Sequence, residues 1–175
     1  MSAFGALVRS GRVATTARCR RVVHRLRRGD DRACDARIPR SAQVQVLLTV
    51  LDESVASLRS ADTAVAACGA PDGAAGRTAR ECARALSGFH RLRVRLAELP
   101  ITEPDLVDVR AYAGRLLAYD QWMVQQALNV AYTVHPDART EAARLQLNGL
   151  GRPADELRRL RDALKATGRR EERQP

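Results

Sequence analysis

Apolar side chains recur every seven residues along three long segments of the chain. This spacing is close to two turns of an α-helix, so it gives each segment one apolar stripe along its length. The first segment covers residues 41–68, the second 74–99 and the third 105–134. Their series are Val44, Leu51, Leu58 and Val65; Cys82, Phe89 and Leu96; and Val109, Leu116, Met123 and Val130. Three long helices joined by short turns pack antiparallel, which predicts an all-α fold.

Helix-stopping residues separate these segments and mark out two shorter helices after them. Gly and Pro residues at 69–73, Pro100 and the His135-Pro136-Asp137 corner end the three long helices. One short helix then precedes Asn148, and another begins at Pro153 and ends at Gly168. We therefore expect an antiparallel bundle of three long helices plus two shorter C-terminal helices at 41–168, followed by a polar tail at 169–175.

Two helix starts carry recognisable capping residues. Ser41 follows Pro39 and is an expected N-cap of the first helix. The run from Thr102 to Asp105 reads as a capping box, in which each of these two side chains accepts a hydrogen bond from the backbone N–H of the other residue.

Positive charge is concentrated in the first 40 residues. That segment holds 11 Arg against three Asp, a net charge of +8, while the remaining residues contribute only +2 of the total of +10. We expect residues 1–40 to form a flexible basic arm that contacts acidic partners or polyanions without reading sequence. Its anion-binding candidates are Arg20, Arg21, Arg25, Arg27 and Arg28. Residues 1–28 also fit an organellar transit peptide, which is the alternative to the cytoplasmic location that we expect.

No pattern for catalysis or metal binding is present in the sequence. Cys19, Cys34, Cys68 and Cys82 form no C-x-x-C pair, which favours reduced thiols. The chain lacks a phosphate-binding glycine loop, a zinc-protease motif and a nucleophile elbow. Our expectation is a protein that is not an enzyme and uses no cofactor or metal, without a membrane span.

The second long segment carries the one resemblance to a known family. His90-Arg-Leu-Arg93 resembles the H-x-L-[KR] patch of histidine phosphotransfer domains, although Val94 stands where that family often has a small residue. The resemblance implies His90 as a phosphoacceptor, and a solvent-exposed histidine beside basic neighbours is the alternative. The same segment has an arginine face that either binds anions or pairs with acids of a neighbouring helix, and it consists of Arg80, Arg84, Arg91 and Arg95.

The third long segment holds the only Trp and all three Tyr of the chain. One stripe at helical spacing mixes aromatic and amide groups, and it consists of Tyr112, Tyr119, Trp122, Gln126 and Asn129. Such a stripe suits a contact between subunits, a small polar pocket or packing at the edge of the core. Asp120 occupies an apolar position of the same segment, which predicts either a carboxylate held by a partner such as Tyr119, Arg115 or an arginine on another helix, or a pocket acid with a raised pKa.

Together these features favour a non-enzymatic interaction protein. We expect it to bind another protein, or a second copy of itself, through the third helix, while the arm contacts an acidic partner. The alternatives are a phosphotransfer protein acting through His90 and a polyanion binder of nucleic acid or polyphosphate.

Overall fold

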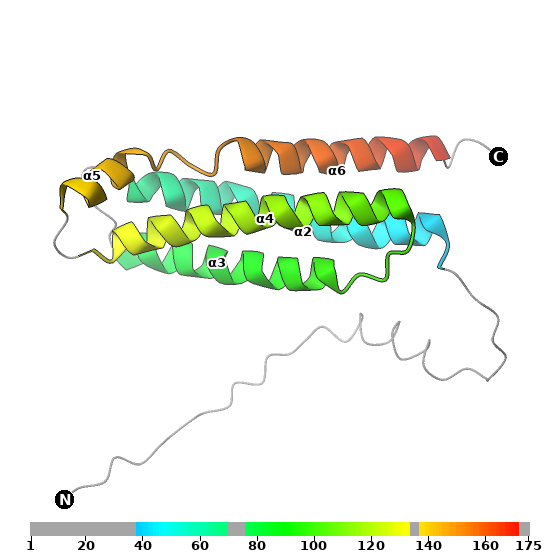
Figure 1. Ribbon diagram of the computed structural model, residues 1–175, viewed down its shortest axis with the longest axis horizontal. Helices are drawn as coiled ribbons and strands as arrows, with labels where there is room; N and C mark the ends of the chain where they lie inside the picture. The colour runs from blue at the N-terminus through cyan, green and yellow to red at the C-terminus, as the bar shows by residue number, and fades with distance from the viewer. Residues whose placement is uncertain (1–37, 70–75, 134–136, 172–175) are drawn as a thin grey trace, which may run out of the picture. The chain divides into compact units, whose positions relative to one another are not determined.

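The computed structural model describes residues 38–69, 76–133 and 137–171, and all of the regular structure in these ranges is helical (Figure 1). In chain order the helices are α2 (Arg40–Cys68), α3 (Gly76–Ala97), α4 (Pro104–Ala131), α5 (Ala138–Leu145) and α6 (Arg152–Glu171). The predicted all-α bundle of three long helices with two shorter C-terminal helices is confirmed. The five arginines proposed in the arm lie outside the described residues, as do Cys19 and Cys34.

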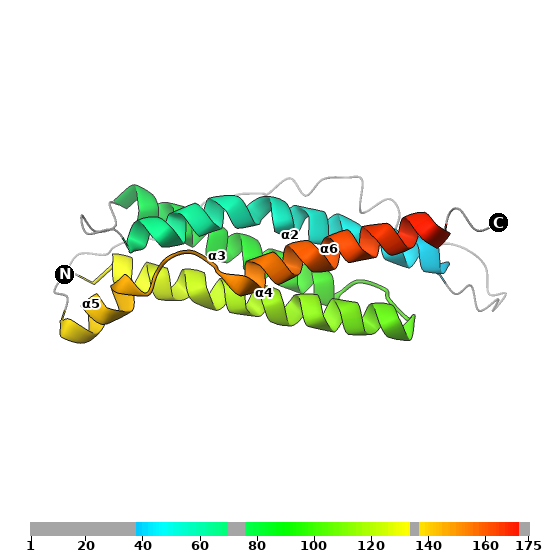
Figure 2. The same cartoon turned by 90° about the horizontal axis from the view of Figure 1, so that it is seen from above.

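Four of the helices lie side by side in an up-down-up-down arrangement (Figures 1 and 2). Helices α2 and α4 contact each other, and both contact α3 on one side and α6 on the other. The short α5 lies at one end of the bundle and precedes the turn into α6. One consequence is that α6 covers the groove between α2 and α4 on its side.

The core is built almost entirely from aliphatic side chains. The whole Val44 series of α2 is buried, and Phe89 of α3 is the one aromatic side chain that is fully buried in the described residues. In α4 the better-buried series is not the one that begins at Val109 but the one containing Leu106, Ala113, Asp120 and Ala127. The seven-residue spacing therefore predicted the positions of the helices. One of the buried positions of α4 carries a carboxyl group, that of Asp120.

Both predicted capping motifs are wrong, and a buried side chain of α2 explains the second one. Helix α2 begins at Arg40, so Ser41 lies inside it and makes no cap. At the start of α4 the side-chain Oε1 of Gln43 accepts hydrogen bonds from the backbone N–H groups of Thr102, at 2.8 Å, and Glu103, at 3.1 Å. Gln43 thus takes the Thr102 N–H that a capping box needs, and the Asp105 carboxylate instead accepts hydrogen bonds from Arg40.

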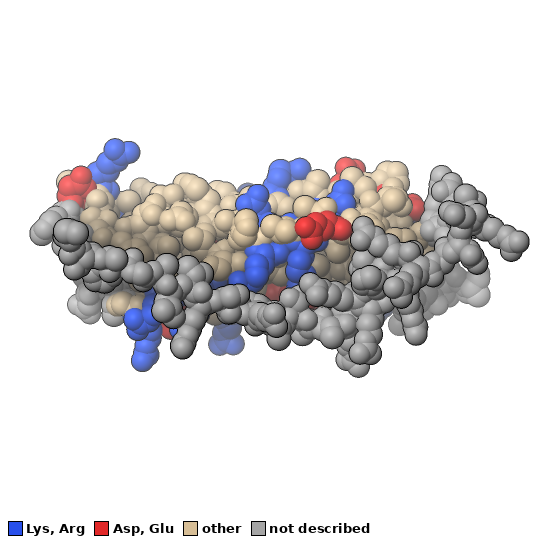
Figure 3. Space-filling model, turned by 90° about the horizontal axis from the view of Figure 1, so that it is seen from below, with Lys and Arg blue, Asp and Glu red and all other residues tan. Residues whose placement is uncertain are grey.

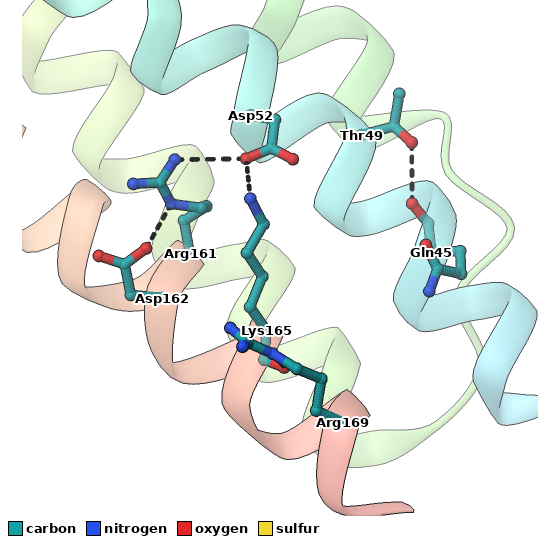
Figure 4. Close-up of polar contacts among 7 residues, drawn as sticks. All are labelled: Gln45, Thr49, Asp52, Arg161, Asp162, Lys165 and Arg169. Atoms are coloured by element: carbon teal, nitrogen blue, oxygen red, sulfur yellow. Dashed lines mark hydrogen bonds and ion pairs between the residues drawn. The ribbon is translucent and has the colours of Figure 1, made fainter. Parts of the chain in front are cut away.

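Helix α6 is fastened to α2 by charged contacts on the surface (Figure 4). Asp52 Oδ1 of α2 accepts hydrogen bonds from Lys165 Nζ, at 2.8 Å, and from Arg161 Nη1, at 3.3 Å. The two basic side chains hold the pKa of the Asp52 carboxyl below its ordinary value. The helix also continues to Glu171, three residues into the expected tail, since the residues after Gly168 are strong helix formers.

The turn before α6 is held against α2 by a second aspartate. Asp62 Oδ1 accepts a hydrogen bond of 2.7 Å from the backbone N–H of Leu150. Gly149 has φ +122°, and a Cβ at this position would lie only 2.5 Å from Asp62 Oδ1. This position therefore requires glycine for its backbone conformation and for the close approach of the carboxylate.

Candidate interaction surface on helix α4

Two large aromatic side chains of α4 face solvent and contact each other. Tyr119 is 45% exposed and Trp122 is 51% exposed. Their ring centroids are 5.4 Å apart and their planes are inclined by 48°. A tilted ring pair of this kind is a favourable aromatic contact, so the two side chains hold each other in place on the surface.

Tyr112, the first residue of the predicted stripe, lies against α6 instead of facing solvent. The hydroxyl group of Tyr112 donates a hydrogen bond of 3.3 Å to Glu156 Oε2 of α6, which places Tyr112 half-buried against that helix. Helix α6 begins at Arg152, only four residues before Glu156, and it runs antiparallel to α4. Arg158 of α6 still acts electrostatically on Asp120, about two turns beyond Tyr112, so the exposure of Tyr119 and Trp122 follows from the face of α4 on which they lie.

The amide groups of the proposed stripe lie farther along α4. Gln126 is partly buried, and Asn129 is exposed and accepts a hydrogen bond of 2.9 Å from Gln125 at its Oδ1. Tyr132 follows the last turn of the helix and is 65% exposed. The sequence stripe did not include Tyr132, although its spacing of three residues from Asn129 extends the same face.

A groove between α3 and α4 opens beside this surface. Its volume is about 580 Å³, and it is lined by His90, Arg93, Val94, Leu96 and Ala97 of α3 and by Arg110, Ala111, Gly114, Arg115 and Ala118 of α4. His90 is exposed at this groove, beside Arg93. His90 and Arg93 belong to the four-residue patch found in the sequence, whereas Arg110 has no such local signal, because the groove depends on which faces of the two helices meet.

The arginine face predicted for α3 is exposed, and one of its members forms an ion pair. Arg80, Arg84 and Arg91 are exposed, while Arg95 pairs with Glu53 of α2. Figure 3 shows the side of the bundle on which α3 lies, with basic side chains gathered near the middle of the face. For Arg95 the structure thus shows the pairing with a neighbouring helix that the sequence offered as the alternative to anion binding.

Asp120 lies in the core without the ion-pair partner that we expected. It is 0% exposed, and neither carboxyl oxygen accepts a hydrogen bond from any described residue. Burial raises the pKa of Asp120 to about 7, with Arg158 lowering it and Asp62 raising it to smaller extents. The expected partners Tyr119 and Arg115 are exposed on α4, because neighbouring positions of a helix point in different directions.

The two cysteines of the described residues lie together in the core. Cys68 at the end of α2 and Cys82 in α3 are buried free thiols, and their Sγ atoms are 3.7 Å apart. Burial and the neighbouring Cys68 sulfur raise the pKa of the Cys82 thiol above its ordinary value. Such a thiol reacts slowly at neutral pH, since the thiolate is the nucleophile.

No group of three or more His, Cys, Asp or Glu side chains in the described ranges could hold a metal ion. None of the described helices combines the length and the apolar character needed to cross a membrane.

Comparison of the chain with protein-family models, with curated proteins and with solved structures finds no match.

Proposed function

We propose that this protein is a non-enzymatic interaction protein that binds a partner protein, or a second copy of itself, through the surface of α4 formed by Tyr119, Trp122, Gln126 and Asn129. The observation that carries the proposal is the half-exposed pair of Tyr119 and Trp122, whose rings contact each other on a face that α6 leaves uncovered.

The energetics of the pair support this proposal. An aromatic side chain has roughly 150–250 Å² of surface to bury, so each half-exposed ring leaves about 100 Å² in water. At about 25 cal/mol per Å², covering both rings is worth roughly 5 kcal/mol before the costs of association. Tyr and Trp are also the residues most often found as anchors of protein interfaces.

The basic arm adds a second, electrostatic contact in this proposal. Residues 1–40 carry a net charge of +8, which attracts an acidic partner over a distance of about 10 Å at moderate ionic strength. We propose that the arm accelerates association with that partner, while the aromatic rings of α4 determine how long the complex lasts.

A pull-down with matched variants tests the proposal. The parent protein, the Tyr119→Ala/Trp122→Ala variant and a Val46→Ala control are each used on native lysate before and after nuclease treatment, and sedimentation velocity measures self-association. Val46 is an exposed apolar residue of α2, 38% accessible, and lies away from the proposed surface.

We expect the double variant to lose the bound protein or the dimer, and Val46→Ala to retain it. The two truncations remove anchors worth about 2 kcal/mol each in binding, which weakens the complex by roughly a thousandfold. Equal binding by all three proteins contradicts the proposal, as does material that disappears from every sample after nuclease treatment.

A further inference from the structure

The floor of the α3–α4 groove is made of small and aliphatic side chains. Ala111, Gly114 and Ala118 follow one another on α4 at spacings of three and four residues, and Ala97 of α3 lies on the opposite side. A Cβ added to Gly114 would lie 3.9 Å from Leu96 Cδ2, an ordinary contact distance, so the floor has open space at Gly114. The floor therefore accepts apolar groups and offers them few polar atoms.

The rim of the groove is positively charged. Arg93, Arg110, Arg115 and His90 line it, and no Asp or Glu is among the lining residues. Arg93 donates to the Oε1 of Gln121 at 2.8 Å, and Arg110 donates to the backbone oxygen of Leu99 at 2.9 Å.

The third rim arginine likewise has a neutral neighbour. The guanidinium of Arg115 lies 5.5 Å from the ring centroid of Tyr112. Within the described residues these contacts of the three rim arginines are thus all to uncharged groups. By contrast, Arg161 and Lys165 on α6 are paired with the Asp52 carboxylate. Each guanidinium has five N–H donors, so most of the donors at the rim are available to carboxylates.

The length of the groove matches a short helix. Its lining on α4 extends from Arg110 to Ala118, which is about 12 Å or two helical turns. Trp122 lies four residues beyond Ala118, one turn farther along α4. A helix of about three turns thus reaches from the basic rim to the exposed aromatic pair.

We infer that the α3–α4 groove receives an acidic, amphipathic helix of a partner protein, whose aliphatic side chains pack on the small-residue floor and whose carboxylates pair with Arg93, Arg110 and Arg115. This inference rests on the proposed function and names the chemistry of the partner. The chain's own arm is a poor occupant because its charge of +8 is repelled by the same arginines. A nucleic acid is disfavoured because its sugar-phosphate backbone leaves the apolar floor without complementary groups.

Calorimetric titration with a defined probe tests the inference on the full chain. The probe is a synthetic helical peptide of about 14 residues with Leu on one face and Glu on the other. A peptide with Gln in place of Glu and a single-stranded oligonucleotide of equal charge are the comparisons. The groove variant is Arg93→Gln/Arg115→Gln, and its matched control is Arg80→Gln/Arg91→Gln, which removes two exposed arginines of α3 outside the groove.

We expect the acidic peptide to bind the parent and the control alike, and to bind the groove variant at least tenfold more weakly. The Gln peptide should bind more weakly than the Glu peptide by a similar factor. Circular dichroism confirms that each variant keeps the helical content of the parent.

Three results overturn the inference: the acidic peptide does not bind, the groove variant binds it as the parent does, or the oligonucleotide binds more tightly than the peptide and loses affinity in the groove variant. Titrating Tyr119→Ala/Trp122→Ala separates this inference from the proposed function. If only Tyr119→Ala/Trp122→Ala loses binding, the aromatic surface of the proposed function is supported and the groove is refuted. Loss in the arginine variant alone supports the groove without the aromatic pair.

Discussion

Replacing Asp120 by asparagine should stabilise the bundle at neutral and alkaline pH. The carboxyl is fully buried and accepts no hydrogen bond within the described residues, so ionising it in the folded state is costly. Its pKa is about 7 in the folded bundle against an ordinary value of 3.8. This difference corresponds to about 4 kcal/mol in favour of the protonated form.

The sign of the pH dependence follows from the raised pKa. Between pH 4 and pH 7 the folded state holds a proton that the unfolded chain has released, so the free energy of unfolding falls as the pH rises. The stability is fully present below about pH 4 and is lost as the pH rises through about 7. The pKa values of three other carboxyls, Asp52, Asp105 and Asp137, are lowered, so the stability that they contribute is lost only at acidic pH. Above pH 5 the change in stability that we expect from buried or bonded carboxyls therefore comes from Asp120.

Urea unfolding from pH 5 to pH 8 measures this effect. The parent should lose about 2–3 kcal/mol of unfolding free energy over this range, while Asp120→Asn should show little change and exceed the parent at pH 8 by about 4 kcal/mol. Asp108→Asn, at an exposed position of the same helix, is the control and should follow the parent. A parent stability that is constant or rises over the range refutes the reasoning, and so does an asparagine variant that keeps the parent's slope.

Three further predictions concern the packing of the helices. Prolonged oxidation with diamide should join the buried thiols of Cys68 and Cys82, whose Sγ atoms are 3.7 Å apart. The disulfide should raise stability by about 3 kcal/mol on non-reducing thermal melts, and its absence on mass spectrometry after prolonged exposure refutes this. Gln43→Ala should lower the free energy of unfolding, measured in urea, by about 2–3 kcal/mol, because two backbone N–H groups at the start of α4 lose their acceptor. A decrease below about 1 kcal/mol contradicts this role of Gln43. Gly149→Ala should destabilise the protein and increase hydrogen exchange at the turn before α6, since φ is +122° and Asp62 leaves no space for a Cβ; unchanged exchange there is the contrary result.

The helices were predictable from the sequence because their apolar spacing is a local signal. Val44, Leu51, Leu58 and Val65 repeat within one segment, and all four are buried as the spacing indicates. The starts of the helices were not predictable in the same way. Gln43 lies 59 residues before Thr102 in the sequence. Nothing in the sequence near either residue indicates that the Gln43 side chain accepts a hydrogen bond from the backbone N–H of Thr102 at the start of α4.

The candidate site was predictable in its residue types but not in its extent. Tyr112 and Tyr119 share the seven-residue spacing, yet only Tyr119 is exposed, because Tyr112 lies against Glu156 of α6 while Tyr119 packs on Trp122 at the surface. The length of α6 along α4 is a property of the whole fold. The groove arginines depend in the same way on how α3 and α4 face each other, and the absence of an ion-pair partner for Asp120 depends on three helices together.

Site-specific crosslinking from position 122 tests the central claim most directly. A photoreactive phenylalanine analogue replaces Trp122 in the full chain, and the control carries it at Val46, an exposed apolar position of α2. If α4 is the interaction surface, irradiation in native lysate yields one discrete protein adduct, or a crosslinked dimer, from position 122 and not from position 46, and Tyr119→Ala diminishes it. The same adducts from both positions, or none from position 122, contradict the account.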